Sequence, residues 1–228
     1  MKTHLYYFNW QLQLTLYGSI LDDLEKMDQE HDIYFLSCNG ILKPCWSNRD
    51  ARDSACKRCK FNQKSGISGI RRKVHNLKIE EFVNPQEIED IFQNQNFKYD
   101  TVEDIKLIRY KGIRIGYGAL SSYISWTRNR EPIIDDKFKI YFNKLLKNEI
   151  LLKEAIDRVL EAIKPEVITI FNGRTADVRP VFETALQNGI FLRGVENIMP
   201  RLTEFRKVVF ENVLPHSIQW HTRRINEH

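Results

Sequence analysis

The alternation of apolar and polar positions predicts strands and helices in turn along most of the 228-residue chain. Candidate strands cover residues 4–10, 32–37, 77–83, 166–171, 190–195 and 207–210. The run at 166–171 (EVITIF) is apolar at nearly every position, which is typical of a strand covered on both faces in a parallel sheet. We therefore expect this strand to lie near the middle of the sheet.

Helical spacing of apolar residues fills much of the sequence between these strands. Candidate helices cover residues 13–29, a short segment that starts at 85, 136–163, 177–188 and a last segment that begins at 217. Pro85 suits a first helical position, and Gly189 suits the position just after a helix end. The polar stretch 94–111 shows no clear pattern. Alternating strands and helices predict one α/β domain over 1–228, a Rossmann-like open parallel sheet flanked by helices.

All four cysteines of the chain fall in one short insertion at 38–60, which we expect to be a loop after the second strand. They are Cys38, Cys45, Cys56 and Cys59. The last two form a C-x-x-C pair, a spacing that lets two thiolates reach one tetrahedral ion. The residues between the pairs are polar and charged, so the segment has little apolar surface to bury. A structural Zn²⁺ held by four thiolates would order it.

Other uses of the cysteines remain open. Two disulfides have three possible pairings, an iron–sulfur cluster also takes four cysteines, and the thiols can be free. The first gap, from Cys38 to Cys45, is longer than is usual in a zinc site. The beginning of the chain lacks the pattern of a signal peptide, which predicts a cytoplasmic protein with reduced thiols. Zinc is therefore the favoured expectation.

The excess of positive charge is concentrated in one segment of the chain. The formal net charge is +5, and basic residues gather just after the cysteines, from Lys57 to Lys73. Such a patch beside a zinc knuckle can bind nucleic acid, phosphate or an anionic lipid surface, or it can be a solvated face. No apolar stretch is long enough to span a bilayer. Peripheral contact with the inner face of a membrane is a further expectation.

The ends of the predicted parallel strands indicate where a site would lie, because ligands bind outside the carboxyl ends of such strands. Asn172, Gly173 and Arg174 follow the strand at 166–171, and Glu196 follows the next strand. Gly173 permits a sharp turn, and Arg174 suits a phosphate or carboxylate. Asn172 could instead cap the following helix. We expect Arg174 and Glu196 to be catalytic, with Glu196 as a general base, although a solvated carboxylate is the simpler reading.

Three weaker candidates complete the predicted site. His216 stands before the last predicted helix, where a lone histidine is more often packed than catalytic. Ser121 and Ser122 could cap a helix or bind a ligand. The glycines do not form a dinucleotide-binding fingerprint or a P-loop, and the chain contains no G-x-S-x-G motif, no H-E-x-x-H motif and no Asp-rich metal signature.

Several of these features together resemble bacterial capsular-polysaccharide-type glycosyltransferases of GT-B architecture. The resemblance rests on FNGR at 171–174, on the cysteine pattern and on SSYIS at 121–125, and it extends from about residue 33 to 216. It implies an amino-terminal, acceptor-binding domain of an enzyme that transfers a sugar from a nucleotide-sugar donor to a glycan acceptor. A carboxy-terminal, donor-binding domain would then be missing, and the chain alone would be inactive.

A second function from a different class is a zinc-stabilised module that binds nucleic acid or a protein partner. The basic cysteine segment is its support. Nucleic acid is the less favoured of these partners, because the excess of positive charge is mild.

Overall fold

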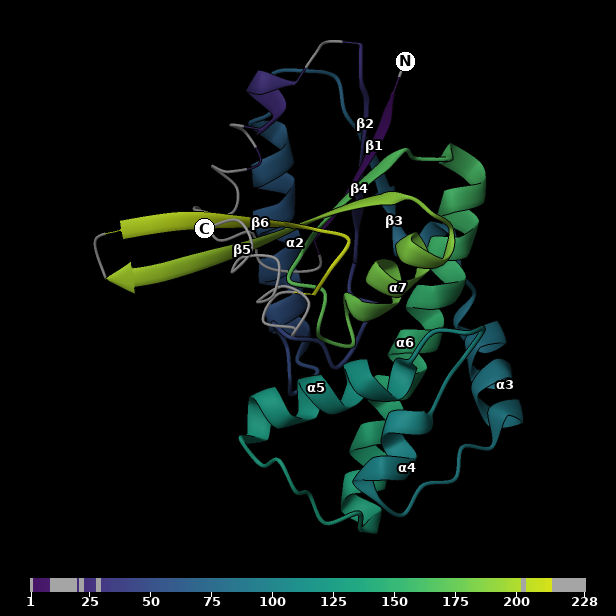
Figure 1. The fold of residues 1–228 in the computed structure, drawn as a ribbon. Coiled ribbons are helices and arrows are strands. Elements are labelled where there is room, and N and C mark those ends of the chain that lie inside the picture. The colour runs from purple at the N-terminus through teal and green to yellow at the C-terminus, as the bar shows by residue number, and fades with distance from the viewer. Residues whose placement is uncertain (1, 9–19, 21–22, 28–29, 202–203, 215–228) are drawn as a thin grey trace.

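A six-stranded sheet forms the centre of the computed structural model, which describes residues 2–8, 20, 23–27, 30–201 and 204–214 (Figure 1). The strands are β1 (Thr3–Tyr7), β2 (Asp32–Ser37), β3 (His75–Lys78), β4 (Val167–Phe171), β5 (Phe191–Arg201) and β6 (Glu204–Glu211). Their order in the sheet is β3-β2-β1-β4-β5-β6. Neighbours from β3 to β5 are parallel, and β6 is antiparallel to β5. The predicted Rossmann-like open sheet is confirmed.

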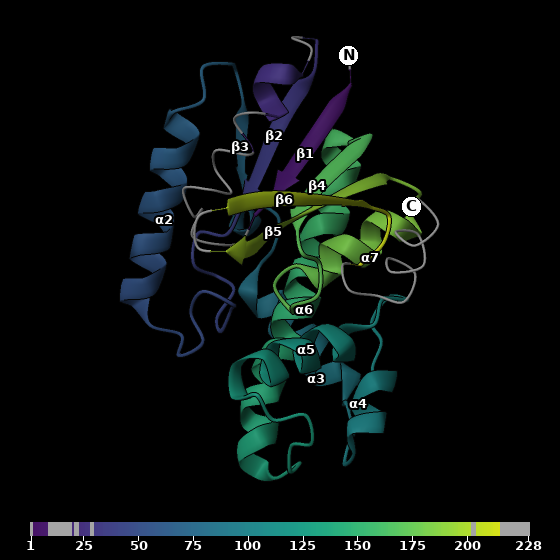
Figure 2. The ribbon, with the colours of Figure 1, turned by 60° about the vertical axis from the view of Figure 1, so that its left-hand side comes forward.

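Alternate residues of the strands enter two different cores. Leu5 and Tyr7 of β1 pack, together with Ile170 of β4, into the larger core that α6 (Asp136–Ile163) and α7 (Arg179–Gln187) cover. Tyr6, the residue between them, joins a smaller cluster on the other face of the sheet. Figure 2 shows α2 (Asp53–Ser68) on that side, away from α6 and α7. The sheet is therefore covered on both faces, as the apolar strand sequences predicted.

The 28-residue helix α6 begins and ends where the apolar spacing predicted. The side chain of Asp135 accepts a hydrogen bond from the backbone N–H of Phe138 (2.7 Å) and caps the first turn. Lys164, with a φ of 46°, ends the helix in the left-handed conformation. Among the described residues, no helix is long and apolar enough to cross a membrane.

Three shorter helices lie at the end of the molecule away from β1, where two of them pack against α6 and α4 packs against α5. They are α3 (Pro85–Gln95), α4 (Val102–Leu107) and α5 (Ile115–Thr127) (Figure 1). Pro85 stands in the first turn of α3, as predicted. The stretch without a clear pattern contains α4, which Thr101 starts by accepting a hydrogen bond from the Asp104 backbone N–H. A six-residue helix is too short for its apolar spacing to be visible in sequence.

Three predicted elements need correction. The strand expected over 77–83 is β3 followed by the short 3₁₀ helix η1 (Ile79–Glu81), because a capping interaction at Lys78 and Glu81 turns the backbone there. The supposed loop at 38–60 is a loop only to Arg52, after which α2 carries Cys56 and Cys59. The strand expected over 190–195 continues to Arg201, because β6 pairs with it antiparallel along most of its length. The helices expected over 13–29 and from 217 lie mostly or wholly outside the described residues.

Candidate functional site at the carboxyl edge of the sheet

The cysteine segment and the turn after β4 lie at the same edge of the sheet. β1, β2 and β4 are parallel, so the segments that follow β2 and β4 both leave at the carboxyl edge. In open α/β folds, ligands bind at this edge. A direct contact joins the two segments, because the backbone N–H of Trp46 donates to Oδ2 of Asp177 (3.1 Å). The hydroxyl of Tyr7, the last residue of β1, donates to the backbone carbonyl of Asp177 (2.6 Å) and holds the segment after β4 against the sheet.

All four cysteines line one small cavity, as their clustering predicted. Cys38 and Cys45 come from the loop after β2, and Cys56 and Cys59 lie one turn apart on α2. All four are free thiols. Within the described part of the chain, no three such side chains already stand in a metal-coordinating arrangement. The fold thus collects the four candidate ligands around one point without closing them into a coordination sphere.

Nitrogen donors point at two of the sulfur atoms. The backbone N–H groups of Gly40 and Leu42 lie 3.2 and 3.4 Å from Sγ of Cys38. The side-chain amide of Asn48 donates to Sγ of Cys56 (3.2 Å). Gly40 makes this turn with a φ of 106°, in the region that favours glycine. Donors to sulfur stabilise a thiolate more than a thiol, and donors to the ligands are characteristic of the surroundings of bound metals.

Without a cation, burial keeps the thiols of Cys38, Cys45 and Cys59 protonated. Burial is the main cause that raises the pKa of Cys38 to about 12 and that of Cys59 to about 11. The pKa of Cys45 is also raised, first by burial and then by the negative charge of Asp177. Such thiols are unreactive at neutral pH. Redox or nucleophilic chemistry at these three thiols is therefore disfavoured, whereas a bound cation would reverse the shifts.

The structure brings Asn172, Arg174 and Glu196 together, as the sequence predicted. The Asn172 amide nitrogen donates to Oε1 of Glu196 (2.8 Å), and Nε of Arg174 donates to the Asn172 carbonyl oxygen (2.8 Å). An ion pair of 3.8 Å joins Arg174 to Glu196. One detail is corrected: Glu196 lies inside β5 rather than after it, because β5 continues past the sheet as a ribbon with β6 (Figure 1). The catalytic roles of Arg174 and Glu196 stay predictions.

The backbone at this turn is unusual. Asn172 and Gly173 have φ values of 61° and 87°, so two successive residues are left-handed. A Cβ on Gly173 would come within 3.1 Å of Ile170 and Leu214 side-chain atoms. Backbone outliers held by their surroundings cluster at ligand sites. Here the side-chain hydrogen bonds of Asn172, which is almost fully buried, hold the turn.

Replacing Asn172 by leucine should lower the free energy of unfolding by about 3 kcal/mol. Leucine resists the left-handed backbone and leaves the largely buried Glu196 carboxylate without its amide donor. Urea unfolding measures the change. Asn172→Gly is the matched control, since glycine keeps the backbone and loses only the hydrogen bonds, and it should lose about half as much. Equal stability of the Leu and Gly variants would show that the left-handed turn carries no strain.

The remaining predicted residues do not meet at this site. Ser121 and Ser122 lie in the middle of α5 and cap no helix, because α5 begins at Ile115. Ser122 is buried, and its hydroxyl accepts a hydrogen bond from the Ala176 backbone N–H (2.9 Å). This bond attaches the segment after β4 to α5. His216 lies outside the described residues.

Two cavities escaped the sequence analysis. One is basic and lies between α2 and the ends of β2 and β3. The other, of about 430 Å³, lies between α5, the start of α6 and the cysteine segment. Its lining includes Tyr123, Trp126 and Tyr141. The ring centroid of Tyr141 lies 6.0 Å from that of Trp126 and 6.4 Å from that of Tyr123. The helical spacing of Tyr123 and Trp126 was visible in sequence, but it reads equally as a buried helix face.

Comparisons with known proteins assign no family. No family model matches the chain, and no curated protein matches it. Among solved structures, a CDPS from Fluoribacter dumoffii is similar at 10% identity and a TM-score of 0.48, over 84% of this chain and 88% of that one. A deacetylase–teicoplanin complex from the teicoplanin biosynthesis pathway is similar at 10% identity and a TM-score of 0.41, over 86% and 70%.

These findings overturn the resemblance to capsular-polysaccharide glycosyltransferases. Both solved structures belong to other classes of protein, and neither a family model nor a curated relative supports the assignment. The physical reason is that FNGR is only four residues long, and its turn is explained locally by Asn172 and Gly173. The sugar donor, the glycan acceptor and the second domain followed from the resemblance alone, and nothing in the geometry adds to them.

Proposed function

We propose that the protein is a zinc-stabilised ligand-binding domain, in which Cys38, Cys45, Cys56 and Cys59 hold one structural Zn²⁺ beside the binding edge of the sheet. The observation that carries the proposal is the convergence of all four cysteines on one cavity, from a loop and from a helix. Four sulfur ligands suit a tetrahedral structural zinc and leave no open position for catalysis.

The surroundings of the cysteines fit such an ion. Hydrogen-bond donors already face Sγ of Cys38 and Cys56, and they would offset part of the thiolate charge. Zinc would also explain how a polar segment is ordered. Residues 46–54 contribute no side chain to the buried apolar core, so packing alone gives them little stability. When bound, the ion would tie the loop after β2 to the first turns of α2.

Binding is the activity that the edge supports best. The charged groups at this edge pair with one another. Arg174 and Glu196 form an ion pair, and the side-chain amide of Asn172 is hydrogen-bonded to both. A general base needs to reach a substrate proton, whereas Glu196 is held by its neighbours. The cysteine segment lies where it can form a wall for a ligand, and Asp177 joins that wall to the turn after β4.

Protein purified without chelator should contain about one zinc ion per chain, with zinc–sulfur distances near 2.3 Å in X-ray absorption spectra. The expectation follows from the four convergent thiols. Elemental analysis gives the stoichiometry, and the absorption edge separates zinc from iron. Metal-free protein with two disulfides by mass spectrometry would refute the proposal.

A further inference from the structure

A second, basic cavity opens at the same edge, about 350 Å³ in volume, between α2 and the carboxyl ends of β2 and β3. It is lined by Ser37, Cys38, Asn39, Lys60, Gln63, Lys64, Ile67, Asn76 and Lys78. The volume lies in the range of small-molecule sites. Because Cys38 and Asn39 belong to its wall, the cysteine cluster and this cavity are built on the same loop.

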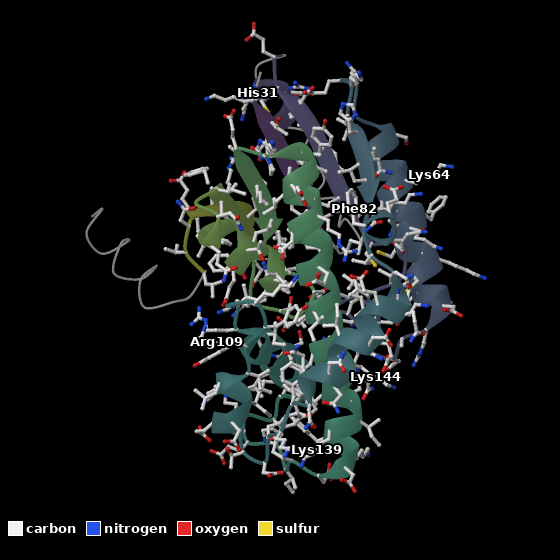
Figure 3. All side chains as sticks on the ribbon, turned by 90° about the vertical axis from the view of Figure 1, so that its right-hand side faces the viewer. His31, Lys64, Phe82, Arg109, Lys139 and Lys144 are labelled. Atoms are coloured by element: carbon white, nitrogen blue, oxygen red, sulfur yellow. The ribbon has the colours of Figure 1, made fainter. Side chains whose placement is uncertain are left out.

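Three lysines give the cavity its charge. Lys60 and Lys64 lie one turn apart on α2, and Lys78, which also lines the cavity, is the last residue of β3. Among the described residues, none of the three ammonium groups is seen in an ion pair with a carboxylate. Figure 3 shows Lys64 on the outer side of the molecule, along α2. Three unneutralised cations around one cavity attract an anion.

The acidic residues nearby are already engaged at the rim. Glu80 accepts a hydrogen bond from the backbone N–H of Asn39 (3.2 Å), and Glu81 accepts one from the backbone N–H of Lys78 (3.1 Å). Both belong to η1, and neither lines the cavity. Apart from Ile67 and Cys38, the lining therefore consists of cationic and neutral polar side chains, and it includes no carboxylate.

Gln63 gives a second and independent indication of a ligand. It is only 7% exposed, yet its amide nitrogen has no hydrogen-bond partner within the described chain. A buried donor without a partner costs about 1–3 kcal/mol. Gln63 stands between Lys60 and Lys64 on α2 and lines the same cavity. An oxygen-rich anion in the cavity would accept this hydrogen bond.

We propose that this cavity binds the phosphate group of a small phosphate-bearing molecule, with Lys60, Lys64 and Lys78 as charge partners and Gln63 as the buried donor. The inference deepens the proposed zinc-stabilised binding function and rests on it for the placement of the wall at Cys38. Phosphate suits the site because its oxygens accept several hydrogen bonds at once while its charge matches the lysines. A neutral ligand would not balance the positive charge of the three lysines.

A small ligand fits the geometry better than a nucleic acid strand. Nucleic acid binding uses a charged groove with exposed stacking platforms. Here the unpartnered donor of Gln63 is buried in the lining of the same cavity as the three lysines, where a single phosphate can contact both kinds of group. Lys57 and Arg58 are exposed on the same helix but do not line the cavity, so a nucleic acid surface would use them as well.

Inorganic pyrophosphate is the probe for the test, titrated into the zinc-replete full chain by calorimetry. The unmodified chain should bind it saturably with one site. Lys64→Glu and Gln63→Glu should each weaken binding by tenfold or more, because a carboxylate replaces a cation or a donor, whereas Lys57→Glu should change the affinity less than twofold. Lys64 and Lys57 are both exposed on α2, so neither change threatens folding.

Two results would overturn the inference. One is the absence of saturable binding, and the other is an equal loss with Lys57→Glu and Lys64→Glu. A twenty-nucleotide single-stranded DNA that binds more tightly than pyrophosphate, with equal dependence on Lys57, would assign the surface to nucleic acid instead. Zinc content measured on each sample separates the two proposals. Saturable pyrophosphate binding by protein that carries no zinc when purified without chelator would support the anion cavity and contradict the zinc site. Zinc-containing protein that binds no pyrophosphate would support the zinc site and contradict the anion cavity.

Discussion

Serine in place of both Cys56 and Cys59 is expected to abolish zinc binding and to unfold residues 38–59 locally, while the sheet stays folded. Two remaining thiolates hold zinc poorly. The segment then loses its cross-link, because few of its side chains reach the core. The sheet has a separate core in which Leu5, Ile168 and Ile170 are fully buried. The loss is therefore local rather than global.

Hydrogen exchange measures this prediction residue by residue. Amides of the cysteine segment, including those of Gly40 and Leu42, should exchange at least a hundredfold faster, which corresponds to about 2.7 kcal/mol of local stability. Amides of β1 and β4 should keep their protection. Ser54→Ala is the matched control, since it changes an exposed side chain of the same helix. Unchanged exchange in the double variant would mean that packing, not metal, orders the segment.

Alanine in place of Gly116 should destabilise the protein by about 3 kcal/mol, although alanine is the better helix former by about 1 kcal/mol. Gly116 lies in α5, and its backbone N–H donates to the carbonyl of Ile108 (3.2 Å). A Cβ there would stand 1.8 Å from the backbone carbonyl oxygen of Ile105. That atom belongs to α4 and cannot rotate away, so the two helices would have to separate.

Chemical denaturation tests the Gly116 prediction by the shift of its midpoint. Ser125→Ala in the same helix is the control and should change the free energy of unfolding by less than about 0.5 kcal/mol. The comparison with Gly118→Ala is informative, because the nearest atom there is a carboxylate oxygen at the end of the Glu149 side chain rather than a backbone atom. An increase in stability for Gly116→Ala would show that α4 and α5 do not approach as closely as described.

Features with a local cause were predictable from the chain alone. The bounds of α6 follow from its apolar stripe, from Asp135 at its start and from the turn before Pro165. β4 was recognisable because a strand buried on both faces is apolar almost throughout. It was also predictable that the segments which follow the parallel strands meet at one edge of the sheet, because parallel strands end on the same side. This arrangement brought Asn172 and Arg174 to Glu196 as expected.

Helix α2 shows where the sequence pattern misled. The segment has no apolar stripe, and its polarity favoured a loop. The usable signal was propensity instead, since Ala, Lys, Arg and Gln between residues 55 and 64 are good helix formers. That helix places Cys56 and Cys59 one turn apart, toward Cys38 and Cys45. The same misreading hid the basic cavity, because Lys60, Gln63 and Lys64 share a side only if the segment is helical.

The sequence by itself determined the α/β order of the elements, the parallel part of the sheet from β3 to β5 and the clustering of the cysteines, because backbone periodicity and spacing are properties of neighbouring residues. Only the tertiary structure decided that the amide nitrogen of Gln63 is buried without a partner, that Lys78 lines the same cavity as Lys60 and Lys64, and that Asp177 joins the cysteine segment to the turn after β4. These facts depend on contacts between residues up to 131 positions apart. Burial and pairing of that kind arise from packing, which no local pattern encodes.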